Sequence, residues 1–286
     1  MKNLGDPFQL ELCIKMQPLK KIVVKVGTST LTHDNGRLNL RRIDRLVRTL
    51  SDLKSSGLEV ILVSSGAIAV GVSRLGLGKR PSELHFRQAA AAVGQCELMY
   101  IYERLFAEYG YSVGQILLTH EDVAEKTRRQ NLINTFMALI ELGTIPIVNE
   151  NDSVTTEELS GLHIGDNDNL SAIVADLCEA SLLIMLTDID GLYDSDPSEN
   201  PDARLIPVVD RIDDEIISMA GGAGTNRGTG GMMTKVSAAR FCMKNGIDAV
   251  VASGDNPGVL YGICEGKHIG TLFRAPRRRE QEKGAF

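Results

Sequence analysis

The sequence lacks the features that would place a protein in a membrane or in an oxidising compartment. None of its apolar runs approaches the roughly 18 residues that a membrane-spanning helix needs. The N-terminal stretch carries acidic side chains among short apolar pieces and shows no export signal. The five cysteines (Cys13, Cys96, Cys178, Cys242 and Cys264) are scattered and form no CxxC pair, which argues against disulfides and structural zinc. These absences favour a soluble cytoplasmic protein with no membrane partner.

Three common nucleotide-binding signatures are also absent. The chain has no GxxxxGK[ST] of P-loop proteins, no HRD with DFG of protein kinases, and no GxGxxG after its first apolar run. The formal net charge of −6 argues against nucleic acid as a partner, because phosphate backbones need a basic face. The basic run from Arg274 to Arg279 is more typical of a solvated chain end than of a binding patch. Any phosphate site must therefore combine parts scattered along the chain.

Short apolar runs alternate with helical patterns along the 286 residues. The runs typical of buried strands are Ile22–Val26, Val60–Val63, Val113–Leu118, Ile145–Val148, Leu182–Leu186 and Ala249–Ala252. Residues 40–53, 89–106 and 132–142 show apolar side chains at helical spacing, and residues 194–207, with three prolines, predict a surface excursion or small hairpin. The alternation predicts an α/β fold, an open, mostly parallel sheet sandwiched between helices, with ligands at the carboxyl ends of the strands.

A glycine-rich run leads into a helical pattern around Lys235. Six of the eleven residues from Gly221 to Gly231 are glycine, so the backbone can turn its N–H groups toward an anion. The following helix would add the positive end of its dipole, and Lys235 a full positive charge near a terminal phosphate. The alternative is a flexible surface loop that ends in a solvated lysine.

Two further candidates stand at the ends of the first two predicted strands. Lys25 interrupts the first apolar run, where a buried ammonium group is costly unless it meets an anion. The alternative is an edge strand from which the lysine extends into water. Ser65 follows the second strand and opens a helix rich in small residues. There a serine either caps the helix or, with nearby backbone N–H groups, binds a carboxylate.

Acids and amides collect after the fourth predicted strand. Asn149 to Asp152 follow it directly, and Gly165 to Asn169 come a short distance later. So many polar groups at strand ends are difficult to place in a core, although Asn and Asp also favour ordinary turns. A calcium-binding EF-hand is excluded, because the sixth and twelfth positions counted from Asp166 are Ser171 and Leu177. We assign no metal-ligating residue.

The fifth predicted strand ends in Thr187 and Asp188, followed by Ile189, Asp190 and Gly191. A strand that ends in Asp-x-Asp-Gly resembles the nucleophile motif of haloacid dehalogenase-like phosphatases, with Asp188 as the nucleophile. The match is imperfect, since Leu192 stands where that motif has Thr or Ser. A turn stabilised by the aspartate side chains is the other alternative.

Six segments together resemble motifs of the amino acid kinase family, in the family's order. They are IVVKVGTS at 22–29, VSSGAIAVG at 63–71, AAVGQ at 91–95, VNENDSV at 148–154, GDNDNLS at 165–171 and GTGGMMTK at 228–235. NENDSV with GDNDNL resembles the glutamate 5-kinase branch rather than the sibling kinases for aspartate, acetylglutamate, carbamate and UMP. The resemblance runs from about residue 20 to residue 273.

This resemblance implies ATP-dependent phosphorylation of the γ-carboxylate of L-glutamate to γ-glutamyl phosphate, the first step toward proline. It further implies Mg²⁺ carried with ATP, proline as a feedback inhibitor, hand-over of the product to glutamyl phosphate reductase, and a homo-oligomer. One alternative is a sibling kinase acting on a related carboxylate. Another is a regulatory amino-acid sensor without turnover, against which the presence of Lys25, Lys235 and Asp168 argues.

The resemblance also assigns roles to individual residues. Lys25 and Lys235 would neutralise the transferring phosphoryl group, with Asp168 holding both ammonium groups in place. Ser65, Asp152 and Asn167 would bind glutamate, the acid meeting its amino group. The residues expected near ATP are Lys25, Thr187, Asp188, Thr229, Gly230, Gly231, Met232, Met233, Thr234 and Lys235.

The domain organisation expected from the resemblance is one amino acid kinase domain at residues 20–273. About 20–175 would form a glutamate-binding lobe and about 176–273 an ATP-binding lobe. Residues 1–19 would be an N-terminal extension and 274–286 a basic C-terminal tail, without the PUA domain that many members carry. His163 replaces a lysine that many members have two residues before the glycine of GDNDN, so that charge is not supplied here.

Overall fold

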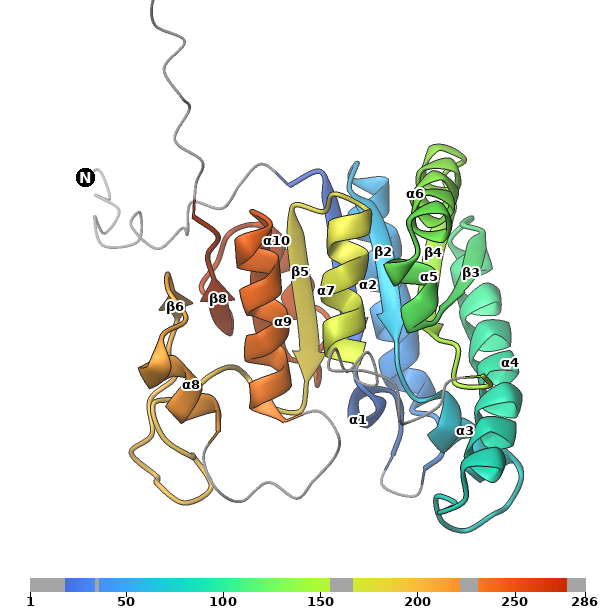
Figure 1. Cartoon of the computed structure of the whole chain (residues 1–286), viewed down its shortest axis with the longest axis horizontal. Helices are drawn as coiled ribbons and strands as arrows, with labels where there is room; N and C mark the ends of the chain where they lie inside the picture. The colour runs from blue at the N-terminus through green and yellow to red at the C-terminus, as the bar shows by residue number, and fades with distance from the viewer. Residues whose placement is uncertain (1–18, 34–35, 155–166, 222–230, 277–286) are drawn as a thin grey trace, which may run out of the picture.

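The apolar runs of the sequence form one eight-stranded sheet in the computed structural model, which describes residues 19–33, 36–154, 167–221 and 231–276 (Figure 1). The strands are β1 (Lys21–Val26), β2 (Glu59–Ser64), β3 (Val113–Leu118), β4 (Ile145–Glu150), β5 (Leu182–Thr187), β6 (Val208–Val209), β7 (Asp248–Ser253) and β8 (Thr271–Phe273). Their order is β3-β4-β2-β1-β5-β7-β8-β6. The first six strands of this order, β3-β4-β2-β1-β5-β7, are parallel to one another. Strand β8 is antiparallel to β7, and β6 is parallel to β8.

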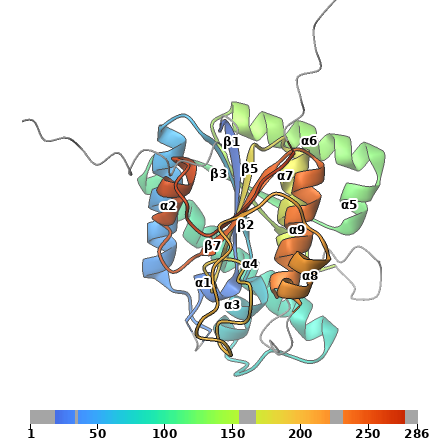
Figure 2. The ribbon, with the colours of Figure 1, turned by 90° about the vertical axis from the view of Figure 1, so that its left-hand side faces the viewer.

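Helices cover both faces of this sheet, as the edge-on view in Figure 2 shows. One layer contains α6 (Lys126–Glu141), α7 (Asn167–Leu177) and α9 (Met232–Lys244), and the other contains α2 (Leu40–Ser55), α4 (Leu84–Glu108) and α10 (Val259–Cys264). The other helices are α1 (Thr28–Leu31), α3 (Ala67–Arg74), α5 (His120–Ala124) and α8 (Asp214–Ala220). The predicted α/β fold, a mostly parallel sheet between helices, is thus confirmed.

The alternation of side chains along β1 decides where Lys25 lies. Val23 packs into the apolar core beneath α6, α7 and α9, whereas Ile22 and Val24 pack into the core on the other face. Lys25 is two residues after Val23, so it belongs to the same face as Val23. Because β1 lies between β2 and β5, the edge-strand alternative for Lys25 is wrong.

The structure corrects the prediction at one polar segment. Asn167 and Asp168, placed in sequence at a strand end, form the first turn of α7. Asn and Asp stabilise helix starts as well as turns, and the apolar residues that follow, from Leu170 to Leu177, supply the buried face of a helix. The helical pattern predicted around Lys235 is confirmed, because α9 begins at Met232, three residues before Lys235.

Several remaining expectations concern the connections and the ends. Tyr193 and Leu205 form an isolated antiparallel bridge across the proline-containing excursion, which gives it the predicted hairpin character. Residues 1–18 and 277–286 lie outside the described residues, while Arg274 contacts Asp210 through two nitrogens at 2.6 and 2.9 Å. Across the described ranges, no helix has both the length and the apolarity to span a membrane.

Candidate active site

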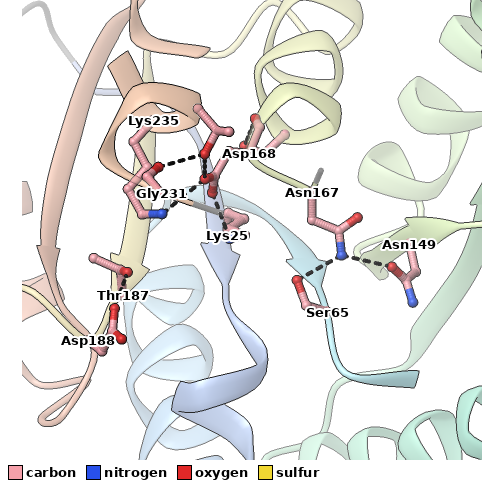
Figure 3. A network of polar contacts seen from close by, with 11 residues as sticks. Lys25, Ser65, Asn149, Asn167, Asp168, Thr187, Asp188, Gly231 and Lys235 are labelled. Carbon is pink, nitrogen blue, oxygen red and sulfur yellow. Dashed lines mark hydrogen bonds and ion pairs between the residues drawn. The ribbon is translucent and has the colours of Figure 1, made fainter. Parts of the chain in front are cut away.

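Three charged side chains from three separate elements meet above the carboxyl end of β1 (Figure 3). Lys25 of β1 places its Nζ 2.6 Å from Oδ1 of Asp168 on α7. Lys235 of α9 places its Nζ 3.1 Å from Oδ2 of the same carboxylate. All three side chains are buried, with 6%, 3% and 0% of Lys25, Lys235 and Asp168 exposed. The structure thus brings together two lysines that are far apart in sequence, on one carboxylate.

The electrostatics of Asp168 follow from these contacts. Burial by itself raises the pKa of its carboxyl, but the Coulombic attraction of Lys25 and Lys235, helped by hydrogen bonds, outweighs burial and holds that pKa below its ordinary value. Asp168 is therefore ionised. Since two ammonium groups share one carboxylate, these three side chains together carry one net positive charge, which suits an anionic ligand.

The start of α9 completes this cluster. Gly231 is the N-cap residue of α9, and the hydroxyl of Thr234 lies 2.8 Å from both the Gly231 carbonyl and Oδ2 of Asp168. The first backbone N–H groups of a helix lack partners within it and carry partial positive charge. The N-terminus of α9 and Lys235 therefore present positive charge from the same element.

An amide cluster lies beside the charged cluster, one residue earlier on α7. Nδ2 of Asn167 donates to Oγ of Ser65 at 2.7 Å and to Oδ1 of Asn149 at 3.0 Å. Nδ2 of Asn149 in turn donates to Oε1 of Gln95 on α4 at 2.9 Å. Asn167 thus joins Ser65, after β2, to Asn149, near the end of β4 (Figure 3). Consecutive residues of one helix face the two clusters.

Close packing of α3 on α4 fixes the position of Ser65. Gly66 adopts a left-handed backbone (φ 99°), which only glycine takes without strain, and it is the N-cap residue of α3. Farther along, a Cβ added to Gly71 would collide with the carbonyl of Ala90, and one added to Gly94 with that of Ala67. The two helices can approach this closely only because both positions lack a side chain.

Asp152 follows β4 at the same edge of the sheet and is partly buried. Burial raises the pKa of its carboxyl, and the nearby positive charge of Arg80 lowers it in part, with burial the larger effect. A carboxylate in such a place gains from a cationic partner. No contact of Asp152 with Ser65 or Asn167 is seen within the described residues.

The remaining expected nucleotide residues lie along β5 and α9. The Thr187 hydroxyl donates to Asp188 at 2.9 Å, and Asp188 is exposed beyond the end of β5. Met232 packs against the core beneath α9, whereas 39% of Met233 is exposed. Thr229 and Gly230, like His163, lie outside the described residues.

Sequence reasoning did not assign functions to Gln95 or Asn149. Both stand in segments that resemble family motifs, AAVGQ and VNENDSV, so a signal was present. Their partnership was not visible, because the two residues are 54 positions apart and meet only when α4 packs beside β4.

Comparison with known proteins places this site in a family. A family model described as the amino acid kinase family matches residues 20–253. Glutamate 5-kinase of Clostridium perfringens is 54% identical over 259 residues, covering 90% of this chain and 96% of the relative. Glutamate 5-kinase of Listeria monocytogenes is 51% identical over 266 residues, covering 93% of this chain and 96% of the relative.

Solved structures share the fold at low sequence identity. Carbamate kinase from Giardia lamblia bound to AMP-PNP has a TM-score of 0.64 at 14% identity, covering 90% of this chain and 99% of that one. UMP kinase from Bacillus anthracis has a TM-score of 0.62 at 17% identity, covering 91% and 98%. These matches do not favour the phosphatase alternative for Asp188. The chain belongs to the amino acid kinase family and, by its sequence similarity, to the glutamate 5-kinases within it.

Proposed function

We propose that this protein transfers the terminal phosphoryl group of ATP to the γ-carboxylate of L-glutamate, giving γ-glutamyl phosphate and ADP. The observation that carries the proposal is the Lys25–Asp168–Lys235 cluster, with the amide cluster beginning at the adjacent Asn167. The first cluster has the charge for a polyphosphate, and the second has the hydrogen-bonding groups for an amino acid. The high identity to glutamate 5-kinases supports glutamate as the acceptor.

The chemistry needs positioning and charge neutralisation rather than a base. The acceptor carboxylate is ionised at neutral pH, so one of its oxygens attacks the γ-phosphorus without losing a proton. As that O–P bond forms, the bond from the γ-phosphorus to the bridging oxygen breaks, and ADP leaves with the electron pair. The principal barrier is the approach of two anions.

Lys25 and Lys235 address that barrier. Their buried ammonium groups would contact the oxygens of the transferring group and offset its negative charge as the acceptor approaches. Asp168 would keep both nitrogens at fixed positions, because each of its oxygens already holds one of them. Little rearrangement would then be needed during transfer, which is how preorganised charges lower a barrier.

The acceptor would lie over the amide cluster. Ser65 and the N-terminal backbone of α3 would bind a carboxylate of glutamate, while Asn167 and Asp152 would meet its ammonium group. The burial that raises the pKa of Asp152 makes its ionised form costly, and the substrate ammonium would compensate that cost.

Magnesium enters this proposal as part of the Mg·ATP substrate. The carboxylate of Asp168 is held by two ammonium groups, which makes it a poor metal ligand. Within the ranges that the structure describes, no three His, Cys, Asp or Glu side chains gather into a potential metal site. The phosphate oxygens and water would therefore supply the ligands, as Mg²⁺ usually requires.

The lobes and partners expected from the resemblance stay part of this proposal. Residues of about 20–175 would bind glutamate and about 176–273 would bind ATP, with α7 at the junction. Proline would compete for the glutamate site, the product would pass to glutamyl phosphate reductase, and the chain would form a homo-oligomer. Competition kinetics, coupled assays with the reductase and light scattering test these three points in turn.

The test of the function is a trapping assay. The purified protein is incubated with Mg·ATP, hydroxylamine and an acceptor, and an acyl phosphate appears as the hydroxamate. Glutamate, aspartate and N-acetylglutamate are compared in parallel, and we expect product with glutamate alone. Hydroxamate from another acceptor would assign a sibling activity, and ligand binding without turnover would support the sensor alternative.

A further inference from the structure

One hydrogen bond in the amide cluster has a fixed direction. The backbone N–H of Glu150 donates to Oδ1 of Asn149 at 2.9 Å. A backbone N–H can only donate, so the side-chain oxygen of Asn149 must face it. The orientation of this amide is therefore set by the main chain of β4.

The orientation of the Asn149 amide also determines its hydrogen bond with Gln95. With its oxygen facing Glu150, Asn149 must present its Nδ2 toward α4, where Oε1 of Gln95 accepts the hydrogen bond. Gln95 directly follows Gly94, one of the positions at which α4 closely approaches α3. The packing of α4 on α3 thus places a hydrogen-bond acceptor beside Nδ2 of Asn149.

The orientation of the Asn149 amide also determines which groups Asn167 and Ser65 offer to a substrate. Because Oδ1 of Asn149 accepts, Asn167 must approach it with Nδ2, and the second hydrogen of that Nδ2 goes to Oγ of Ser65. The acceptor that the Asn167 side chain then offers to a ligand is its own oxygen. Since Oγ of Ser65 receives a hydrogen bond, the serine proton points elsewhere and can be donated.

We propose that Gln95 is a positioning residue that, together with the Glu150 N–H, holds the hydrogen-bond polarity of the acceptor site. By anchoring Nδ2 of Asn149, it keeps Asn167 offering an oxygen, suited to an ammonium group, and keeps Ser65 offering a proton, suited to a carboxylate. This pairing selects an α-amino acid over a plain dicarboxylate. The inference rests on the proposed glutamate kinase function and adds a residue that does not itself touch the substrate.

Three variants separate this role from a merely structural one. Gln95→Met keeps the size of the side chain but removes the acceptor, whereas Gln95→Glu keeps an oxygen that accepts from Asn149. Cys96→Ser, at the next and exposed position of α4, is the matched control. For each variant, the KM values for glutamate and ATP, the Ki of glutarate and the thermal midpoint are measured. Glutarate is glutamate without its amino group.

We expect Gln95→Met to raise the glutamate KM about tenfold, equivalent to about 1.4 kcal/mol, with the ATP KM within twofold of wild type. The glutarate Ki should rise less than the glutamate KM, because glutarate keeps the carboxylate that Ser65 would bind but lacks the ammonium group that Asn167 would meet. The preference for glutamate over glutarate should therefore fall. Gln95→Glu should retain that preference, and Cys96→Ser should match wild type. If Gln95→Met does not fold, Gln95→Ala, which adds no bulk, replaces it.

The inference fails if Gln95→Met keeps the wild-type preference for glutamate over glutarate. It also fails if Gln95→Glu loses as much of that preference as Gln95→Met. Neither result bears on the function itself, which fails only if the wild-type protein makes no hydroxamate from glutamate.

Discussion

Replacement of Asp168 by asparagine tests the central electrostatic arrangement. The two side chains have nearly the same shape, but an asparagine has one oxygen and one NH₂ group where the aspartate has two oxygens. Since Lys25 contacts one carboxylate oxygen and Lys235 the other, one ammonium group would face a hydrogen-bond donor. The pair would also lose the negative charge between them.

The expected cost follows from burial. Asp168 is fully buried, and the two lysines are 6% and 3% exposed, so water cannot replace the lost carboxylate. Removing one partner from a buried ion pair typically costs about 3–5 kcal/mol. For a protein of this size such a loss lowers the thermal midpoint by roughly 10 °C. We also expect kcat to fall at least ~100-fold, because the ammonium groups lose their fixed positions.

Calorimetry and the hydroxamate assay measure these two effects. The control is the double variant Asp168→Asn with Lys25→Met, which removes one of the two ammonium groups left without their carboxylate. It should recover part of the lost stability without recovering kcat. A second measurement is the free energy of unfolding of the wild-type protein as the pH is lowered. Because folding lowers the pKa of Asp168, its contribution is complete above the unfolded value of about 3.9 and is lost as the pH falls through the folded value.

An Asp168→Asn protein with a wild-type midpoint and wild-type kcat would refute the reasoning. Recovery of kcat in the double variant would do so as well, because it would show that the second ammonium group is not needed.

Four further predictions concern three positions. Lys235→Met should lower kcat at least ~100-fold and leave the glutamate KM within a few-fold of wild type, and steady-state kinetics showing a near-normal kcat would count against its role. Asp152→Asn should raise the glutamate KM more than tenfold with little effect on the ATP KM, and equal effects on both would remove the proposed ammonium contact. Because burial raises the pKa of Asp152, the wild-type glutamate KM should climb with acidification, beginning above the ordinary aspartate range, and this climb should be absent from the pH profile of Asp152→Asn. Gly94→Ala should lower the thermal midpoint and raise the glutamate KM, because its Cβ would collide with the Ala67 carbonyl and displace α3, which starts beside Ser65.

Most strands could be predicted because they are short apolar runs buried on both faces of a mostly parallel sheet, and the less buried edge strand β3 because it is a similar run. Within the first run, Lys25 was recognisable as the one residue that does not belong in a core. The strands β6 and β8, with two and three residues, are too short to show any pattern.

The helix α7 could not be predicted, because its first residues, Asn167 and Asp168, have the same preferences at a helix start as in a turn. Propensity does not decide between these two structures. Packing does, since the turns that follow bury Leu170 and Val174 completely. The resemblance implied that Asp168 holds two lysines, and the fold shows how the first turn of α7 brings it to them.

The contacts of Gln95 show a second limit of the sequence. A half-buried glutamine on a helix is ordinary, and nothing near Gln95 in the chain indicates a partner. Its role depends on the direction of a main-chain hydrogen bond in β4, which a sequence does not contain.

Because Asn167 and Asp168 are adjacent on α7, a redesign of the protein for a different acceptor is restricted at this helix. Successive helical residues project about 100° apart, so this single turn sends one side chain toward each of the two clusters. Any shift or rotation of α7 made to accommodate a different acid would also pull the carboxylate from its lysines. A redesign for a new acceptor should therefore leave this helix alone and vary Asp152, which follows β4 and belongs to none of the elements that carry the lysines and Asp168.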